Sequence, residues 1–494
     1  MFGIEKLLEK ILNRQNTPKE QREEFNIDTK YVHGLLFYNS YFDKIASALK
    51  RETVAFIVGG WVRDRLLNRE IGNKVDVDLL VTTDPWEIVK NLQMILGKGD
   101  IFKFEKETTV ASIVFTEGNT RYRFDFSFMD VSDILNSNLD FQEKELKIVD
   151  KLNENLLNRD FTINAMAILF DDAIGMGASQ TILFDPSNGL EDLNEGIIKP
   201  VSIENIKKDP VRILRGYRFS QELNFTLNKE FENWIKENKE LIKDSPIERI
   251  RDELLKIFDK KHSKKTIEKL EEVGLLQLII PQTSSIIPSE YEKKYSLQSL
   301  DKFDDFLKKK DDLIIPEVLD LYKPKQFLTD FTDITLSKLY LYLLIRNLNS
   351  KKDIQKVSKS LSLGEKVYKF LLLLNEALGE LKNLNFYNTY SLSYWWYRYK
   401  TVAVNVFLIH LSLENEEEIL KKLQNFYTAI YLKNVVEEPI LSGKEIMEIL
   451  NIPPSKEIGI LKNELLKKQL TGQIRTKKQA ISFIKNLYNN SSTK

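Results

Sequence analysis

The chain has 494 residues, which is enough for two to four domains. Its 73 basic and 73 acidic residues give a formal net charge of zero, so an anionic partner must bind local basic patches. It has no cysteine and only three histidines, His33, His262 and His410. This excludes disulfides and thiolate chemistry, fits a reducing compartment and disfavours a metal site built on clustered imidazoles.

The predicted elements fall into two classes along the chain. Residues 1–35 form a charged, partly helical extension for which no feature predicts a role. Short β-rich runs then alternate with helical patterns up to residue 185, which predicts an α/β domain with a small mixed sheet. The runs are "TVAFIVGG", "VDVDLLV", "ASIVFTEG", "RYRFDFSF" and "TILFDPSNG", and "DPWEIVKNLQMIL" is typical of a helix with an Asp-Pro start.

Beyond residue 200 the β signal almost vanishes, and apolar residues recur at spacings of three and four, which predicts helices. We expect an elongated all-α region and divide it into segments 186–260, 261–430 and 431–494. The longest apolar stretch, "TVAVNVFLIHLSL", is too short to span a bilayer, and the N-terminus does not resemble a signal peptide. We therefore expect a soluble, cytoplasmic protein without a membrane partner; no feature predicts its oligomeric state.

Two aspartates stand two residues apart in the apolar run "VDVDLLV". Because alternate strand residues share a face, Asp76 and Asp78 lie side by side while their neighbours face the core. Such a pair suits Mg²⁺, and Asp125 in "RYRFDFSF" offers a third carboxylate from a second strand. The alternative is a pair of edge-strand aspartates that only keep the protein soluble.

Two glycines, Gly59 and Gly60, lie between a predicted strand and the predicted helix "WVRDRLL". Glycines at such a turn let backbone N–H groups approach a phosphate at a helix N-terminus. Arg63, one turn into the helix, can reach the same anion. The alternative is a simple tight turn, which the nearby Asp76–Asp78 pair makes less attractive.

Three further motifs follow in a characteristic order: "NRDFTINAMA" (158–167), "DPSNGLEDL" (185–193) and "KDPVRILRGYRFSQELNF" (208–225). With these, the chain resembles the class II tRNA nucleotidyltransferases, which are the CCA-adding enzymes and their relatives, the bacterial poly(A) polymerases. The segment "PILSGKEIMEILNIPPSKEIGILKNELLKKQLTGQI" is similar to the tail of the tRNA-specific members. The resemblance covers residues 54–85, 155–260 and 439–480.

The resemblance implies roles for individual residues. Asp76 and Asp78 match the metal-binding pair, and Asp125 matches the third carboxylate of the catalytic set. Asp209 and Arg212 match the pair that reads the incoming base. Positions that match nucleotide-binding residues, including basic ones near the triphosphate, are Gly59, Gly60, Arg63, Asp64, Arg159, Asp160, Asn164, Arg215 and Arg218.

The spacing of the third motif fits this assignment. Residues 209, 212 and 215–216 fall on one face of a predicted helix. An aspartate acceptor and an arginine fork can together match the hydrogen-bonding edge of a base. The alternative is an ordinary surface ion pair worth less than about 1 kcal/mol.

The implied reaction is template-independent addition of cytidine, as CC or as full CCA, to the 3′ end of tRNA. It uses CTP and, for the final residue, ATP, requires Mg²⁺ and releases pyrophosphate. The acceptor–T arm of tRNA is a duplex read by shape and phosphate contacts, for which a basic tail is suited. The last 34 residues hold eight Lys or Arg against one Glu, Glu464. A merely solvated helical tail is the alternative.

Several positions depart from the family pattern. Lys208 replaces the usual Glu, Asn158 replaces the first Arg of the Arg-Arg-Asp motif, and Asp130 stands where an Arg follows the third carboxylate. The stretch 129–157 also lacks an Arg-Pro or His-Pro signature, and in this family that loop helps the switch from C to A addition. CC addition is therefore slightly favoured over CCA addition. Less favoured hypotheses are A-adding activity, poly(A) synthesis and a catalytically silent RNA-binding relative.

Overall fold

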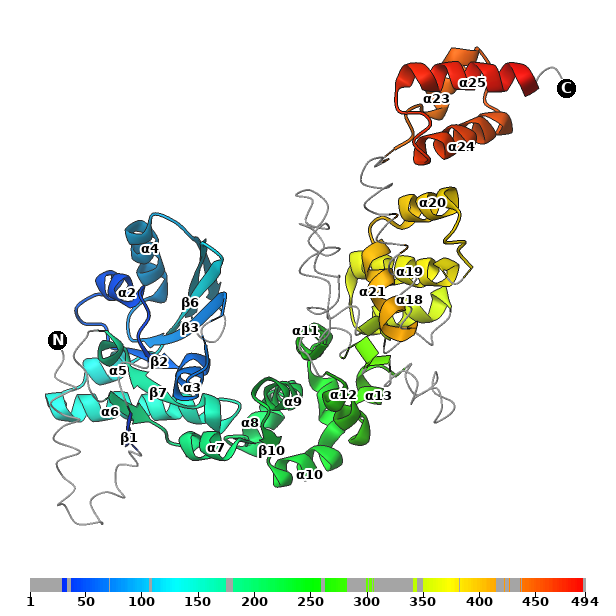
Figure 1. Ribbon diagram of the computed structural model, residues 1–494. Coiled ribbons are helices and arrows are strands. Elements are labelled where there is room, and N and C mark those ends of the chain that lie inside the picture. The colour runs from blue at the N-terminus through cyan, green and yellow to red at the C-terminus, as the bar shows by residue number, and fades with distance from the viewer. Residues whose placement is uncertain are drawn as a thin grey trace. The chain divides into compact units, whose positions relative to one another are not determined.

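The structure is a computed structural model, and it divides the chain into two compact units, Met1–Ser245 and Pro246–Lys494 (Figure 1). Each unit is described by itself. Most of the predicted extension 1–35 lies outside the described residues, as do His33 and His262. The structure describes residues 29–32, 37–70, 72–105, 109–174, 181–258, 263–281, 350–381, 383–414 and 438–491, with short stretches or single residues between 299 and 436.

The first unit contains an eight-stranded sheet with the order β1-β8-β7-β2-β3-β6-β5-β4. Only β3 and β6 pair in parallel, so the sheet is mixed, as predicted. It is larger than the small sheet expected, because three strands were not predicted. The strands are β1 (Thr29–Val32), β2 (Ala55–Val58), β3 (Lys74–Val81), β4 (Asp100–Glu105), β5 (Thr109–Glu117), β6 (Thr120–Phe128), β7 (Ala167–Leu169) and β8 (Thr181–Phe184).

Helices begin where the sequence supplies caps. Asp84 accepts a hydrogen bond from the backbone N–H of Trp86 and is followed by Pro85 at the first position of α4, as predicted. A capping box of Asp140 and Glu143 starts α6. The helices of the first unit are α2 (Phe42–Ala48), α3 (Gly60–Leu66), α4 (Pro85–Leu96), α5 (Ser132–Leu135), α6 (Phe141–Leu157), α7 (Gly189–Glu195), α8 (Ile203–Lys208), α9 (Arg212–Leu223) and α10 (Lys229–Asn238).

The core of the sheet determines where the acidic residues emerge. Phe56 and Leu80 are register partners on neighbouring strands and lie in one buried cluster with Leu152 of α6. Asp78 pairs with Val58 on this same face of the sheet, one step further along. Asp76 and Asp78 retain contact with solvent there, while the alternate residues of β3 are buried. The strand therefore has the predicted alternation.

The described part of the second unit is helical, as predicted, and contains no strand in those residues. Its last three helices share a core around Ile446, Leu465 and Ile484. No helix in the described ranges is long and apolar enough to cross a membrane. The helices are α11 (Ile247–Phe258), α12 (Ser263–Glu272), α13 (Leu275–Ile279), α18 (Lys351–Ser360), α19 (Gly364–Leu381), α20 (Thr389–Tyr399), α21 (Ala403–Glu414), α23 (Gly443–Leu450), α24 (Lys456–Leu470) and α25 (Lys477–Ser491).

Candidate active site

The turn between β2 and α3 requires glycine at Gly59 for two separate reasons. Its φ of 75° lies in the left-handed region, where other residues are strained. A Cβ on Gly59 would also lie only 2.7 Å from Nη1 of Arg159 and 3.6 Å from Oδ2 of Asp78. The turn therefore packs directly against two predicted site residues.

We expect Gly59→Ala to destabilise the protein by about 1–3 kcal/mol, because it combines backbone strain with displacement of Arg159. It should also weaken the nucleotide binding that the sequence predicts for this turn. Gly118→Ala is the matched control, because Gly118 has φ 59° but an added Cβ would meet no atom within 4 Å. Urea unfolding of both variants separates the two effects; equal losses of stability would show that crowding at Gly59 contributes nothing.

Three aspartates and one arginine form an exposed acidic face on the parallel pair β3–β6. Asp76 lies opposite Arg123, and Asp78 lies opposite Asp125. Nε of Arg123 donates to both carboxylate oxygens of Asp125 at 2.9 Å. Since β3 lies inside the sheet, the alternative of edge-strand aspartates is wrong. Arg123 was not predicted, although the alternation in "RYRFDF" places it on the face of Asp125.

The surroundings of Asp76 and Asp78 disfavour the charged form of both carboxyl groups. Surrounding protein displaces water from both carboxyl groups, which raises the pKa of each, and Asp125 adds to the effect by charge repulsion. The ion pair with Asp125 raises the pKa of Arg123. Within the described residues, no three acidic or histidine side chains form a metal-binding group. Two carboxylates disfavoured as anions on one face nevertheless fit a divalent cation, and an oxygen-only donor set suits Mg²⁺.

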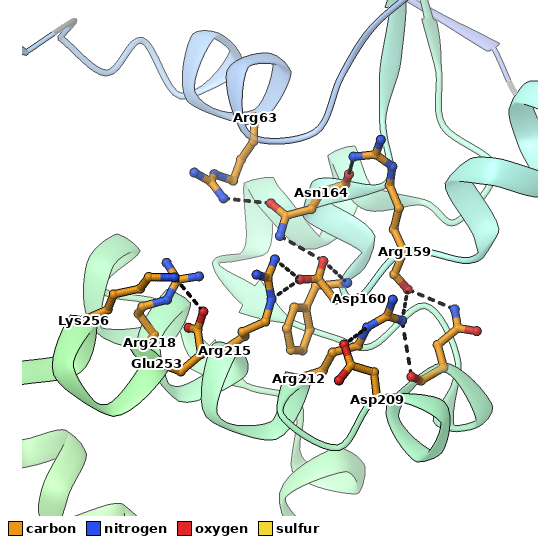
Figure 2. A network of polar contacts seen from close by, with 12 residues as sticks. Arg63, Arg159, Asp160, Asn164, Asp209, Arg212, Arg215, Arg218, Glu253 and Lys256 are labelled. Carbon is orange, nitrogen blue, oxygen red and sulfur yellow. Dashed lines mark hydrogen bonds and ion pairs between the residues drawn. The ribbon is translucent and has the colours of Figure 1, made fainter. Parts of the chain in front are cut away.

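A polar network connects α3, the turn after α6, and α9 (Figure 2). Nη1 of Arg63 donates to Oδ1 of Asn164 at 2.7 Å, and Nδ2 of Asn164 donates to Oδ1 of Asp160 at 3.2 Å. Nε of Arg215 donates to Oδ2 of Asp160 at 2.8 Å. Asp64 accepts from Nε of Arg63 at 2.9 Å. The structure therefore brings these predicted residues together.

Burial and charge compete at the buried residues of this network. Burial raises the pKa of Asp160, but the ion pair with Arg215 and the hydrogen bonds from Asn164 and Phe161 outweigh it, so the net pKa is lowered. Burial lowers the pKa of Arg159. The negative charges of Asp78 and Asp160 raise it, but the net pKa remains lowered. Nη1 of Arg159 also donates to the backbone oxygen of Asn164 at 3.5 Å.

Asp209 and Arg212 lie together, but not on one helix as predicted. Asp209 caps the end of α8, and Arg212 is the first residue of α9. The residue before a proline is driven out of the helical region, and Asp209 precedes Pro210. Nε of Arg212 is 3.5 Å from Oδ2 of Asp209, and Nη1 donates to the backbone oxygens of Asn158, Arg159 and Asn205 at 3.2–3.3 Å.

Two further residues of the site, Arg218 and Asn205, are held by contacts with neighbouring residues. Arg218 forms an ion pair with Glu222 at 3.1 Å one turn along α9. Asn205 was not predicted; it is buried, and its Nδ2 donates to the backbone oxygens of Leu157 and Arg159 at 2.7 and 2.9 Å. The sequence offers little to identify it, since it shows only an asparagine next to the apolar Ile206, and the burial of Asn205 is visible only in the structure.

The residues that depart from the family pattern lie at the margin of this network. Nδ2 of Asn158 donates to the backbone oxygen of Glu154 at 2.8 Å, so its side chain closes α6. Lys208 is the exposed last residue of α8. Asp130 accepts from the backbone N–H of Ser132 at 2.9 Å.

Two family models match the chain. Residues 55–199 match the poly A polymerase head domain, and residues 224–287 match the probable RNA and SrmB-binding site of polymerase A. The CCA-adding enzyme of Lactobacillus gasseri is 34% identical over 45% of this chain and 50% of its own length. That of Bacillus subtilis is 25% identical over 86% of this chain and 92% of its own. The chain thus spans about half the length of the curated relatives that share more than 30% identity.

Solved structures have the same fold. The apo form of a CCA-adding enzyme is 21% identical, with a TM-score of 0.60, over 92% of this chain and 96% of that chain. A tRNA-processing enzyme is 26% identical, with a TM-score of 0.52, over 87% and 100%. The mixed-sheet head that carries the acidic face, Arg63 and Arg159 is the part of the chain that matches the poly A polymerase head domain. Over these regions the chain is similar to the class II tRNA nucleotidyltransferases, to which the matching CCA-adding enzymes belong.

Proposed function

We propose that the protein adds cytidine to the 3′ end of tRNA from CTP and releases pyrophosphate. The observation that carries this proposal is the acidic face of β3–β6, next to Gly59, Arg159 and the arginine network in the same compact unit. CCA-adding enzymes among the relatives support it. So do structures of CCA-adding enzymes with CTP, with ATP and with tRNA, whose fold this chain shares.

The chain's own residues perform binding and orientation in the proposed reaction. Arg63, Arg215 and Arg218 bind the triphosphate, with Asn164 and Asp160 holding two of these guanidinium groups in place. Asp76 and Asp78 would hold a Mg²⁺ ion, which would stabilise charge on the α-phosphate and lower the pKa of the RNA 3′-hydroxyl. The hydroxyl oxygen attacks the α-phosphorus in line, the bond to the β-phosphate breaks, and pyrophosphate leaves.

Base selection is assigned to Asp209 and Arg212. Three backbone carbonyls hold Nη1 of Arg212, and the carboxylate of Asp209 lies beside Nε, so the orientation of the guanidinium is fixed before a nucleotide binds. This leaves the N–H groups of Nη2 as the donors next to the Asp209 acceptor, and such a fixed donor and acceptor distinguish bases by hydrogen bonding. The reading of tRNA itself is assigned to the basic helices α24 and α25, whose binding should weaken as salt rises.

The extent of addition is the finer part of the proposal. We propose that the protein stops after two cytidines, because Lys208, Asn158 and Asp130 alter the surroundings of the base-reading pair and the stretch after the third carboxylate. Full CCA addition is the second candidate, since the base-reading pair and the acidic face are present. Poly(A) synthesis and addition of A alone are less favoured candidates. A catalytically silent RNA-binding protein is the non-enzymatic alternative.

Sequencing the products made on three tRNAs tests this proposal. The tRNAs end at the discriminator base, after C and after CC, and each is incubated with Mg²⁺, CTP and ATP. We expect the first two to be extended to CC and the third to remain unextended. Addition of A to the third would contradict CC-only activity and favour CCA addition, long A tails would favour a poly(A) polymerase, and no incorporation on any tRNA would favour the silent binder.

A further inference from the structure

Three guanidinium groups surround a single phenylalanine ring in the first unit. The central carbon atoms of Arg63, Arg215 and Arg218 lie 5.2, 5.5 and 4.2 Å from the ring centroid of Phe219. The ring is 6% exposed, and Arg63 and Arg218 are nearly as buried. Arg63 belongs to α3, whereas Arg215 and Arg218 both precede Phe219 on α9.

Three cations gathered around one ring, two of them buried and Arg215 partly exposed, repel one another unless other groups compensate. Each has an acidic partner: Asp64 at 2.8 Å from Arg63, Asp160 at 2.6 Å from Arg215 and Glu222 at 3.1 Å from Arg218. Asn164 also links Arg63 to Asp160 and thereby to Arg215, while Glu222 lies beside Arg218 on α9. The ring adds an attraction common to all three cations, because the negative face of an aromatic quadrupole attracts guanidinium groups, which an aliphatic side chain of similar size cannot do.

The position of the ring is itself determined by the polar network. Phe161 packs edge-on against Phe219, with centroids 5.8 Å apart and an interplanar angle of 83°. A Cβ on Gly216 would lie 3.0 Å from Phe161, so glycine allows α9 to approach it closely. The backbone N–H of Phe161 donates to Oδ1 of Asp160 at 2.8 Å, which is the carboxylate that pairs with Arg215.

We propose that Phe219 is a positioning residue that gathers Arg63, Arg215 and Arg218 into one binding site for a polyphosphate anion. The ligand is the triphosphate of the incoming nucleotide, so the inference rests on the proposed function. Phe219 touches no reacting atom; it keeps three cations converged in the absence of the anion, so that less reorganisation accompanies binding.

Fluorinated phenylalanines test this role without changing the shape of the side chain. Replacing Phe219 with mono-, di- and trifluorophenylalanine weakens the ring quadrupole stepwise. We expect the affinity for inorganic tripolyphosphate and the KM for CTP to worsen stepwise, reaching about tenfold for the trifluorinated ring. The kcat at saturating CTP and the affinity for tRNA should change much less.

Phe231 provides a matched control. It also packs against Phe161, with centroids 6.0 Å apart, and is as buried as Phe219. Among the described residues, no cationic group lies over its ring, which stacks instead on Trp234. The same fluorinated series at Phe231 should leave tripolyphosphate affinity unchanged.

The outcomes distinguish a failure of the proposed role of Phe219 from a failure of the proposed function. If the unmodified protein binds tripolyphosphate and CTP but the Phe219 series is flat, or if it matches the Phe231 series, the role of Phe219 is overturned while the proposed function stands. If the unmodified protein binds neither CTP nor tripolyphosphate, the proposed function fails and this inference fails with it.

Discussion

Replacing Asp78 with asparagine is expected to lower the kcat for cytidine incorporation at least about a thousandfold. It removes a proposed ligand of a cation that stabilises the transition state by several kcal/mol. Affinity for tRNA should remain nearly unchanged, since tRNA binding is assigned to helices α24 and α25. Incorporation of labelled CTP and a filter-binding measurement with tRNA check the two expectations.

The stability of this variant distinguishes a catalytic role from a structural one. Folding raises the pKa of Asp78, so above that pKa the charged carboxylate is less stable in the folded than in the unfolded protein. A neutral amide removes this penalty, and in the absence of metal we expect Asp78→Asn to be at least as stable as the wild type at pH 7. Asp133→Asn, an exposed carboxylate paired with Lys151, is the control for activity. Substantial residual incorporation by Asp78→Asn, or a marked fall in its Tm, would contradict the assignment.

Replacing Arg212 with alanine is expected to reduce discrimination between CTP and UTP by about a hundredfold or more, because a site that reads bases by hydrogen bonds loses its donor fork. The affinity for inorganic tripolyphosphate should change less, since Arg63 and Arg215 remain. The ratio of kcat/KM for the two nucleotides measures the effect. Arg398→Ala, which removes ion pairs with Glu376 and Glu380 in the second unit, is the control.

Arg212 also holds backbone carbonyls, so alanine is expected to destabilise the protein by about 1–3 kcal/mol. Asp209→Asn separates selection from folding, because it exchanges an acceptor oxygen for a donor while Arg212 keeps its backbone partners. We expect this variant to have altered base selection and nearly unchanged stability. Equal losses for all four nucleotides in both variants would indicate a structural arginine.

The local parts of the fold could be predicted because they depend on short-range periodicity. The alternation in "VDVDLLV" placed Asp76 and Asp78 on one face, and Asp84 with Pro85 fixed the start of α4. Strands β1, β4 and β7 were not predicted, nor were the two-residue strands β9 (Ile197–Ile198) and β10 (Thr226–Leu227) in the region expected to be all-α. Strands β1 and β7 have only four and three residues and pair with β8 and β2, which are distant in the chain, so pairing with the sheet creates them.

The site could be predicted residue by residue but not as a set of contacts. The motifs identified Arg63, Asp160, Asn164 and Arg215, yet nothing local indicates that Asn164 bridges Arg63 and Asp160. Phe219 illustrates the limit most clearly, because its neighbours come from two helices far apart in the chain. Asp209 shows a different error, since Pro210 is a local signal against a helix that continues through residue 209.

The central claim, that Asp76 and Asp78 hold the cation for nucleotidyl transfer, is tested most directly by anomalous diffraction from crystals grown with Mn²⁺ and CTP. We predict an anomalous peak bound by oxygens of both carboxylates and by the nucleotide triphosphate. Clear density for CTP, with no peak between these two side chains and their oxygens directed apart, would contradict the account.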